Sequence, residues 1–129
     1  MRMTRILAVP FLVLSGACTV FGPKDHVCTA DPKYALKVQI KDSASGAWTA
    51  SSAYVVARDG SFVDSVQVGA APFLDGTQVL LGSNRSGQYQ LTVRKPTYRD
   101  WIRTGIQAAS DGCGVVATDI MVLLQPATP

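Results

Sequence analysis

Residues 34–41 read Tyr34-Ala35-Leu36-Lys37-Val38-Gln39-Ile40-Lys41, and this run decides the fold class of the chain. Tyrosine, leucine, valine and isoleucine recur there at every second position, with lysine and glutamine between the later ones. Because successive side chains of a β-strand point to opposite faces, the alternation predicts a half-buried strand. A helix would instead repeat its apolar side chains about every 3.6 residues, and no window of this sequence does so convincingly.

Six further segments carry strand-like patterns. They cover residues 53–58, 61–68, 77–81, 88–94, 101–109 and 115–124. Polar turns and a loop over 69–76 separate them, and Asp59-Gly60 predicts a type I′ hairpin turn, which needs positive φ values. All nine acidic residues are aspartate, which favours turns, and none is glutamate, which favours helices. Seven short strands at regular spacing predict an all-β fold, a seven-stranded β-sandwich.

A different pattern precedes these strands. Two arginines stand within residues 1–5, an apolar run covers 6–14, and three small residues, Ser15-Gly16-Ala17, come last. This order is typical of a secretory signal peptide. As a helix, the apolar run would measure about 14 Å, far short of a hydrocarbon core of about 30 Å. We therefore expect export rather than a membrane-spanning helix; the alternative is a buried N-terminal helix or strand.

Cys18 follows the small residues directly, so that this segment resembles the lipobox of bacterial lipoproteins. Ser15 stands where a lipobox usually has leucine, with Leu14 one place earlier. The resemblance implies cleavage before Cys18, lipid such as palmitate on its thiol, and a membrane partner through that lipid. Simple cleavage nearby is the alternative. Thr19 rather than aspartate comes next, which implies an anchor in the outer membrane, facing the periplasm.

Cleavage would also change the charge and length of the chain. Loss of residues 1–17 removes two arginines, so the formal charge falls from +3 to +1. The remaining chain of about 110 residues suits one domain. We expect that domain at 34–125, after a lipidated tether over 18–33 and before a frayed tail over 126–129. A near-neutral domain lacks the basic surface of nucleic-acid-binding proteins, so we expect no nucleic-acid partner.

The cysteine count agrees with lipidation. Lipid on Cys18 would leave Cys28 and Cys113 as an even pair in an oxidising compartment, and we predict a disulfide between them. The alternative is a metal site, which would need more ligands than the chain offers. His26 is its only histidine, and it has no Cys-x-x-Cys motif. We therefore expect neither a metal nor a cofactor.

Catalytic patterns are equally scarce. A Ser-His-Asp or Cys-His site needs a histidine beside its nucleophile, whereas His26 lies in the predicted tether. The aspartates of the domain stand beside turn residues or on exposed strand faces, where turn formation explains them. We predict no catalytic residues. The chain is then expected to be a non-enzymatic, lipid-anchored domain of the cell envelope with a structural or partner-binding role.

Two stretches resemble a known family. Residues 38–46, followed by 53–57, are similar to the opening of the carboxypeptidase regulatory-like domain. Residues 87–93, Gly-Gln-Tyr-Gln-Leu-Thr-Val, and then Pro96-Thr97-Tyr98 resemble its segment Gly-x-Tyr-x-Leu-x-Val…Pro-Gly-Tyr. Thr97 stands where the family usually has glycine, so the turn there is expected to be built differently.

The resemblance covers about residues 34–124 and implies a particular topology. The family has the prealbumin-like (transthyretin-like) β-sandwich, an Ig-like Greek key whose first and last strands are parallel neighbours. This arrangement would bring Cys28 and Cys113 to the same end of the domain, which agrees with their predicted pairing. The resemblance carries little information on function, because one fold supports many functions.

One segment, Arg94–Arg103, combines four basic residues with two aromatic ones. Aromatic faces beside guanidinium groups suit stacking on sugar rings or binding of acidic polymers. The alternative function is therefore a carbohydrate- or peptidoglycan-binding module. Its predicted binding residues are Tyr98, Arg99, Trp101 and Arg103. The simpler interpretation is that Tyr98 and Trp101 fill the core while the charges cover an exposed strand face.

Overall fold

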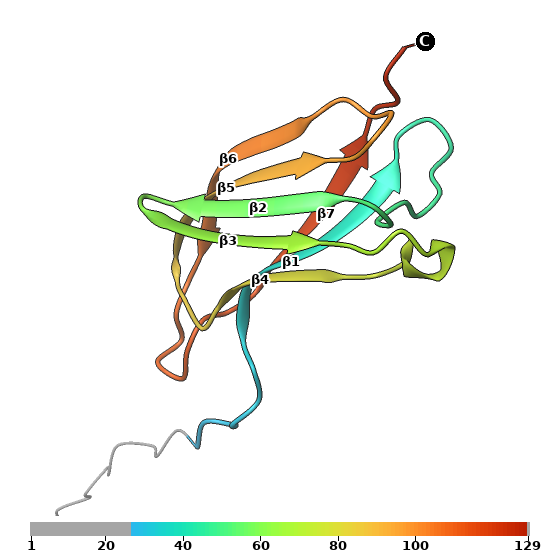
Figure 1. Cartoon of the computed structure of the whole chain (residues 1–129). Helices are drawn as coiled ribbons and strands as arrows, with labels where there is room; N and C mark the ends of the chain where they lie inside the picture. The colour runs from blue at the N-terminus through green and yellow to red at the C-terminus, as the bar shows by residue number, and fades with distance from the viewer. Residues whose placement is uncertain (1–26, 129) are drawn as a thin grey trace, which may run out of the picture.

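The computed structural model describes residues 27–128. It contains seven strands and one short 3-10 helix (Figure 1). The strands are β1 (Tyr34–Asp42), β2 (Tyr54–Asp59), β3 (Phe62–Gln67), β4 (Val79–Ser83), β5 (Gly87–Arg94), β6 (Trp101–Ala108) and β7 (Thr118–Leu124), and the helix is η1 (Pro72–Leu74). The predicted signal peptide, Cys18 and His26 lie outside the described residues.

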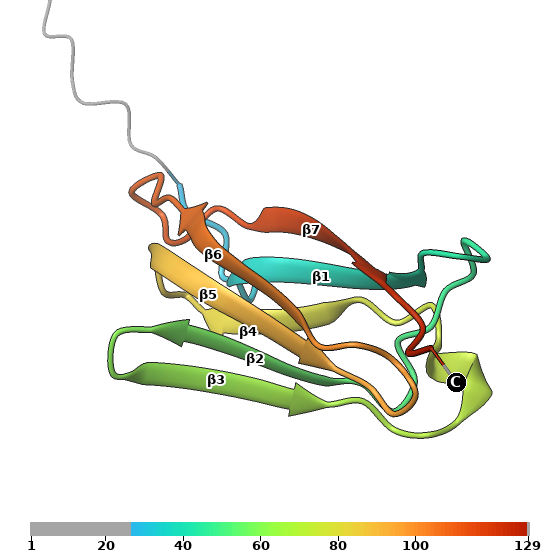
Figure 2. The same cartoon turned by 90° about the horizontal axis from the view of Figure 1, so that it is seen from above.

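The seven strands form two sheets. One has three strands in the order β4-β1-β7, and the other has four in the order β3-β2-β5-β6. Figure 2 shows the two sheets as facing layers. β1 and β7 pair in parallel from Leu36 opposite Thr118 to Asp42 opposite Leu124, and every other strand pair is antiparallel. The predicted all-β class with seven strands is confirmed, as is the parallel pairing of the first and last strands.

The core lies between the sheets and draws on both. In β1 the predicted alternation is confirmed for Leu36, Val38 and Ile40, which have no exposed surface. β5 contributes Tyr89, Leu91 and Val93, and β7 contributes alternate residues in the same way. Burying an aliphatic side chain is worth about 1.5–3 kcal/mol, so this shared core is what holds the sheets together.

The hairpin between β2 and β3 differs from the predicted turn. Asp59 still pairs with Phe62 in the ladder, so the two-residue loop is Gly60-Ser61 rather than Asp59-Gly60. Gly60 has a φ of +58°, whereas Asp59 and Ser61 are not in the positive region. Positive φ at the first loop position alone is the signature of a type II′ turn, which requires glycine there. The predicted type I′ turn is therefore wrong.

β6 contains a bulge that the sequence pattern hides. Leu91 of β5 pairs with Arg103, but Tyr89 pairs with Ile106, so β6 has one residue more than β5 in this interval. Gly105 has a φ of +71°, as a glycine in a β-bulge often does. The extra residue reverses which side chains face the core. Trp101 faces it before the bulge and Ile106 after it.

A disulfide joins Cys28 to Cys113, as predicted, with their Cα atoms 5.3 Å apart. Cys28 precedes β1, and Cys113 lies in the loop that leads to β7, which begins at Thr118 rather than at 115. Because β1 and β7 run in parallel, the segments that precede them meet at one end of the domain. Lys33 also contacts this loop, since its Nζ donates to the Cys113 carbonyl oxygen at 3.3 Å.

The end of the chain is not frayed over 126–128, in contrast to the prediction. The Ala127 N–H donates to the Thr97 carbonyl oxygen at 2.8 Å, and Pro126 forms an isolated bridge with Tyr98. The turn after β5 thus offers the backbone groups that hold this segment. As to membrane spans, the described residues include no helix that is both long and apolar enough to cross a bilayer.

Candidate functional site

The two sheets leave an open margin between β6 and β7, which we call the seam. Each of these strands is the edge of its own sheet, and they lie next to each other (Figure 2). Hydrogen bonds close the seam at both ends. Near one end the Arg99 N–H donates to the Gln125 carbonyl oxygen at 2.9 Å, and near the other the Thr118 hydroxyl donates to the Gln107 carbonyl oxygen at 2.6 Å.

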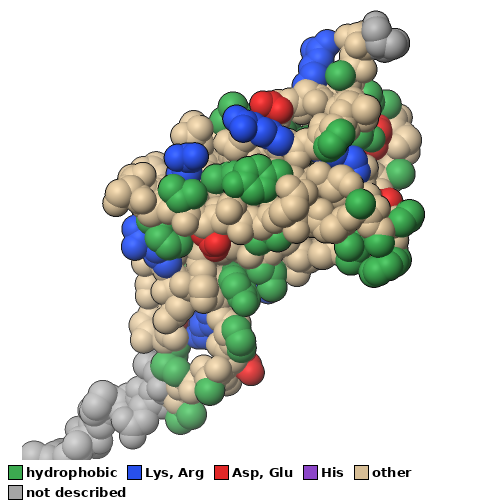
Figure 3. All heavy atoms as spheres, viewed as in Figure 1, with side chains coloured by type: hydrophobic (Ala, Val, Ile, Leu, Met, Phe, Trp, Pro, Cys, Tyr) green, Lys and Arg blue, Asp and Glu red, His purple; other side chains and the backbone are tan. Residues whose placement is uncertain are grey.

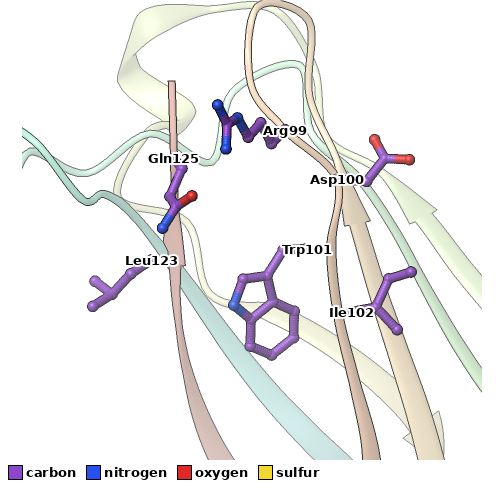
Figure 4. Close-up of a pocket in the computed structure, with 6 residues that line it drawn as sticks. All are labelled: Arg99, Asp100, Trp101, Ile102, Leu123 and Gln125. Atoms are coloured by element: carbon purple, nitrogen blue, oxygen red, sulfur yellow. The ribbon is translucent and has the colours of Figure 1, made fainter. Parts of the chain in front are cut away.

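Two hollows lie along the seam. The first, here the Trp101 hollow, has a volume of about 320 Å³, and the second, the Arg103 hollow, about 220 Å³. The Trp101 hollow is lined by Arg99, Asp100, Trp101, Ile102, Leu123 and Gln125. Figure 4 shows Arg99 and Trp101 on the side of the chain that faces Leu123 and Gln125, with Asp100 and Ile102 turned the other way.

Trp101 both packs on the core and lines a hollow. It lies opposite Val93 in the β5–β6 ladder, so its side chain is on the inward face. Since β6 is an edge strand, the indole is only partly buried against the core cluster, and the rest of it borders the Trp101 hollow. The expectation that Trp101 fills the core and the expectation that it contacts a ligand are therefore compatible.

Arg103 lies on the same face as Trp101, since it pairs with the inward-facing Leu91. Its side chain is nevertheless exposed and borders the Arg103 hollow, together with Asp119 from β7. Arg99 is exposed too and donates to the Thr128 hydroxyl at 3.2 Å. Within residues 27–128, neither arginine has a carboxylate within 4.0 Å.

Tyr98 lies apart from these three residues. Its hydroxyl donates to Oδ2 of Asp42 at 2.6 Å, which ties the turn after β5 to the end of β1. This hydrogen bond is the main reason why the pKa of Asp42 lies below its ordinary value and the pKa of Tyr98 above its own. The structure therefore brings Arg99, Trp101 and Arg103 together along the seam and gives Tyr98 a structural contact elsewhere.

Lys95 completes the polar contacts around Tyr98. Its Nζ donates to the carbonyl oxygens of Thr49 at 3.0 Å and Ser51 at 2.5 Å, and it lies 5.7 Å from the centre of the Tyr98 ring. The ammonium group is thus occupied by backbone oxygens. Of the basic residues in the Arg94–Arg103 segment, Lys95 is the one least available to a ligand.

The outer face of the four-stranded sheet carries the remaining charge of this segment. Nε of Arg94 lies 3.2 Å from Oδ2 of Asp100, and both side chains are more than half exposed. Figure 3 shows this face of the molecule, on which apolar and basic side chains lie singly or in small groups. This is the ordinary surface that the simpler interpretation of the segment predicts.

Leu123 and Gln125 are site residues that the sequence does not reveal. They come from β7 and the residue after it, more than twenty positions beyond Trp101, and only the meeting of two sheet edges brings them to the hollow. Elsewhere, residues 27–128 contain no cluster of three His, Cys, Asp or Glu side chains arranged to hold a metal ion.

Comparisons with known proteins give no family: no protein-family model matches the sequence, and no curated protein matches it either. What the chain does must therefore be argued from its own residues.

Proposed function

We propose that this chain is an exported, lipid-anchored, non-enzymatic domain of the bacterial cell envelope with a structural or partner-binding role. The disulfide between Cys28 and Cys113 is the observation that supports it most directly. Disulfides persist in oxidising compartments, which exported proteins reach. The pairing also leaves Cys18 as the odd cysteine, at the position where a lipobox carries its lipid.

The proposal includes the fold family. We assign the domain to the prealbumin-like β-sandwich of the carboxypeptidase regulatory-like kind, a Greek key. The parallel pairing of β1 with β7 supports this assignment, because the family resemblance implies parallel first and last strands. The two facing sheets of three and four strands are consistent with it.

The anchor would lie at one end of the domain. The described chain enters beside the disulfide, and Figure 1 shows the C-terminus at the opposite end. Residues 18–33 would extend at most about 50 Å, which keeps the domain near the bilayer. In the outer membrane this arrangement would present the seam to the periplasm. Acyl chains anchor at roughly 0.8 kcal/mol per buried methylene, and more than one chain makes the anchor stable.

A second candidate function is carbohydrate or peptidoglycan binding, and the Trp101 hollow favours it. Binding sites for small molecules begin at about 300 Å³ and combine an apolar wall with a few polar groups. The Trp101 hollow offers an indole together with the Arg99 guanidinium and the Gln125 amide. Aromatic rings beside such groups suit the apolar face and the hydroxyl groups of a sugar.

Metabolic labelling with a radioactive fatty acid tests the anchor. The parent chain, expressed in a bacterium with two membranes, should give a labelled band in the outer-membrane fraction. The Cys18→Ala variant should give none, while a Cys28→Ala, Cys113→Ala double variant should keep its label. An unlabelled parent chain would contradict the proposed anchor and location.

Glycan-array and pull-down binding tests the second candidate. Binding should fall in the Trp101→Ala and Arg99→Ala variants and stay unchanged in Trp48→Ala. Trp48 is a suitable control because it is 41% exposed and stacks on Lys41 of β1, outside both hollows. Binding that is unchanged in the first two variants would contradict a site at the seam.

A further inference from the structure

The seam carries a regular row of side chains. Arg99, Trp101 and Arg103 stand at every second position, and residues two apart along an extended chain share a face. For Trp101 and Arg103 the β5–β6 register shows this directly. For Arg99 and Trp101, Figure 4 shows both side chains on the β7 side. The bulge begins just beyond Arg103, so the row ends there.

Within residues 27–128, two guanidinium groups that no carboxylate pairs with therefore flank the indole. The salt bridges among the described residues involve other arginines, and the one hydrogen bond of the Arg99 guanidinium goes to a neutral hydroxyl. Guanidinium groups bind carboxylates through paired hydrogen bonds and stack on flat rings. This set of side chains is thus suited to a ligand that carries both negative charge and ring faces.

The spacing indicates an extended ligand rather than a small anion. Arg103 is four residues beyond Arg99, which in extended chain separates their Cα atoms by about 13 Å. Each arginine borders its own hollow, and the two hollows follow each other along the seam. Arginine side chains that project side by side at that spacing present their guanidinium groups to two separate carboxylates unless they bend toward each other. A chain with repeated carboxylates can supply both.

A peptide strand fits the seam less well than a glycan. An extended peptide would bind by pairing its backbone with the free edge of β6. That edge is already occupied near both ends, by the Arg99–Gln125 and Gln107–Thr118 hydrogen bonds. The bulge at Gly105 further interrupts the regular spacing of backbone groups that pairing requires.

We propose that the seam binds an acidic glycan chain lengthwise, with Trp101 against a sugar ring and Arg99 and Arg103 on carboxylate groups. This inference rests on the carbohydrate-binding candidate above and names its ligand class. Each hollow is also bordered by one aspartate, Asp100 at the Trp101 hollow and Asp119 at the Arg103 hollow. These carboxylates would repel a densely charged polymer, so the proposed glycan carries its own carboxylates at intervals along the chain.

Titration calorimetry with paired glycans tests the proposal on the mature chain in detergent. The probes are oligogalacturonate, the same oligosaccharide with methyl-esterified carboxyl groups, and cell-wall glycan strands stripped of their peptides. At least one acidic probe should bind about tenfold more tightly than the ester, and the difference should shrink at high salt. Oligoglutamate serves as a peptide of matching charge and should bind weakly.

Point variants locate the site. Arg99→Gln and Arg103→Gln should each weaken binding of the acidic probe about tenfold and binding of the ester much less, because glutamine can still hydrogen-bond a neutral sugar. Arg58→Gln is the matched control. Arg58 is exposed on the outer face of the four-stranded sheet, on β2, and lines neither hollow of the seam. Circular dichroism and melting temperature should be unchanged in all three, since none of these side chains is buried.

The outcomes separate the two proposals. Equal binding of acidic and esterified glycans would overturn the acidic ligand and leave carbohydrate binding in place. Failure of every glycan to bind would overturn both. Oligoglutamate that binds as tightly as the acidic glycan would overturn the ligand class in favour of an acidic peptide. Equal losses in Arg58→Gln and in the seam variants would overturn the location.

Discussion

The hydroxyl of Tyr89 donates a hydrogen bond to the carbonyl oxygen of Arg85, four residues upstream, at 2.6 Å. The ring itself is 1% exposed and meets Phe62 edge to face, with ring centres 6.3 Å apart. Such a bond from the start of a strand back to the preceding turn is known in β-sandwich proteins as a tyrosine corner. It fixes the β4–β5 turn onto the core, and burial raises the pKa of Tyr89.

The Tyr89→Phe variant should therefore be less stable than the parent chain. It keeps the buried ring but leaves the Arg85 carbonyl without its donor, which costs about 1–3 kcal/mol of unfolding free energy. Urea denaturation measures the loss. Tyr54→Phe is the control, since Tyr54 is 38% exposed on the outer face of β2, and its urea midpoint should not move. Equal stability of Tyr89→Phe and the parent chain would show that the corner contributes nothing.

Thr97 should be replaceable by glycine with a gain in stability. The Tyr98 N–H donates to the Lys95 carbonyl oxygen at 3.1 Å, and Thr97 in this turn has a φ of +68°. A turn with proline second and positive φ third is type II, which prefers glycine at that third position. Since positive φ costs a residue other than glycine about 1–3 kcal/mol, Thr97→Gly should raise the unfolding free energy by about 1 kcal/mol.

Thr97→Ala is the matched control for that variant. Alanine loses the β-branch but retains the Cβ atom, so most of the positive-φ cost remains and the gain should be smaller than with glycine. Thermal and urea unfolding of the three chains in parallel give the comparison. A Thr97→Gly chain that is less stable than the parent would mean that the side chain contributes more than the backbone costs.

The domain should lose stability in acid because two of its carboxylates, Asp42 and Asp75, become protonated. The pKa of Asp42 is lowered mainly by the hydrogen bond from Tyr98, and that of Asp75 mainly by hydrogen bonding from Ser51. A lowered pKa means that the folded state holds its proton less well than the unfolded state. The resulting stability is present above the ordinary pKa of 3.8 and is lost as the pH falls through the folded value.

The Tyr98→Phe variant tests the assignment to Asp42. Without the phenol, Asp42 loses the main cause of its lowered pKa, so the urea midpoint should fall less between pH 6 and pH 3 than it does in the parent chain. Chemical denaturation at both pH values measures this difference. The same drop in both chains would assign the acid sensitivity to other groups.

Loss of the disulfide should destabilise the domain strongly. Cys28 and Cys113 are 85 positions apart, and a loop of that size restricts the unfolded chain by about 4–5 kcal/mol in the chain-entropy model. Urea unfolding of the chain with and without a reductant measures the effect. In a Cys28→Ser, Cys113→Ser double variant the reductant should have no further effect. A parent chain that is equally stable with and without the reductant would contradict the prediction.

The sequence predicts the strands well and their irregularities poorly. Alternation over 34–41 places Leu36, Val38 and Ile40 in the core because β1 keeps one register with β7 from Leu36 to Asp42. In β6 the inward positions shift from Trp101 and Arg103 to Ile106 and Ala108 across the bulge. An extra residue in one strand is defined only by its partner, so no local pattern can reveal it.

The candidate site divides in the same way. Arg99, Trp101 and Arg103 are predictable because residues two apart in an extended segment share a face. Their grouping with Gln125 is not, since it depends on two edges from different sheets that meet without pairing. Tyr98 shows the limit of composition as a guide. It belongs to the same basic and aromatic run, but its hydroxyl donates a hydrogen bond to Asp42, which lies on β1.

The Cys28–Cys113 bond has a mechanical consequence. If the chain is held on the N-terminal side of Cys28 and pulled at its C-terminal end, the shortest covalent path crosses the disulfide and then follows β7. Residues 29–112 lie outside that path and carry no tension. β7 is already extended, and its ladder with β1 runs along the direction of pull. An oxidised domain would therefore transmit load along one strand while the rest of its fold stayed unstretched.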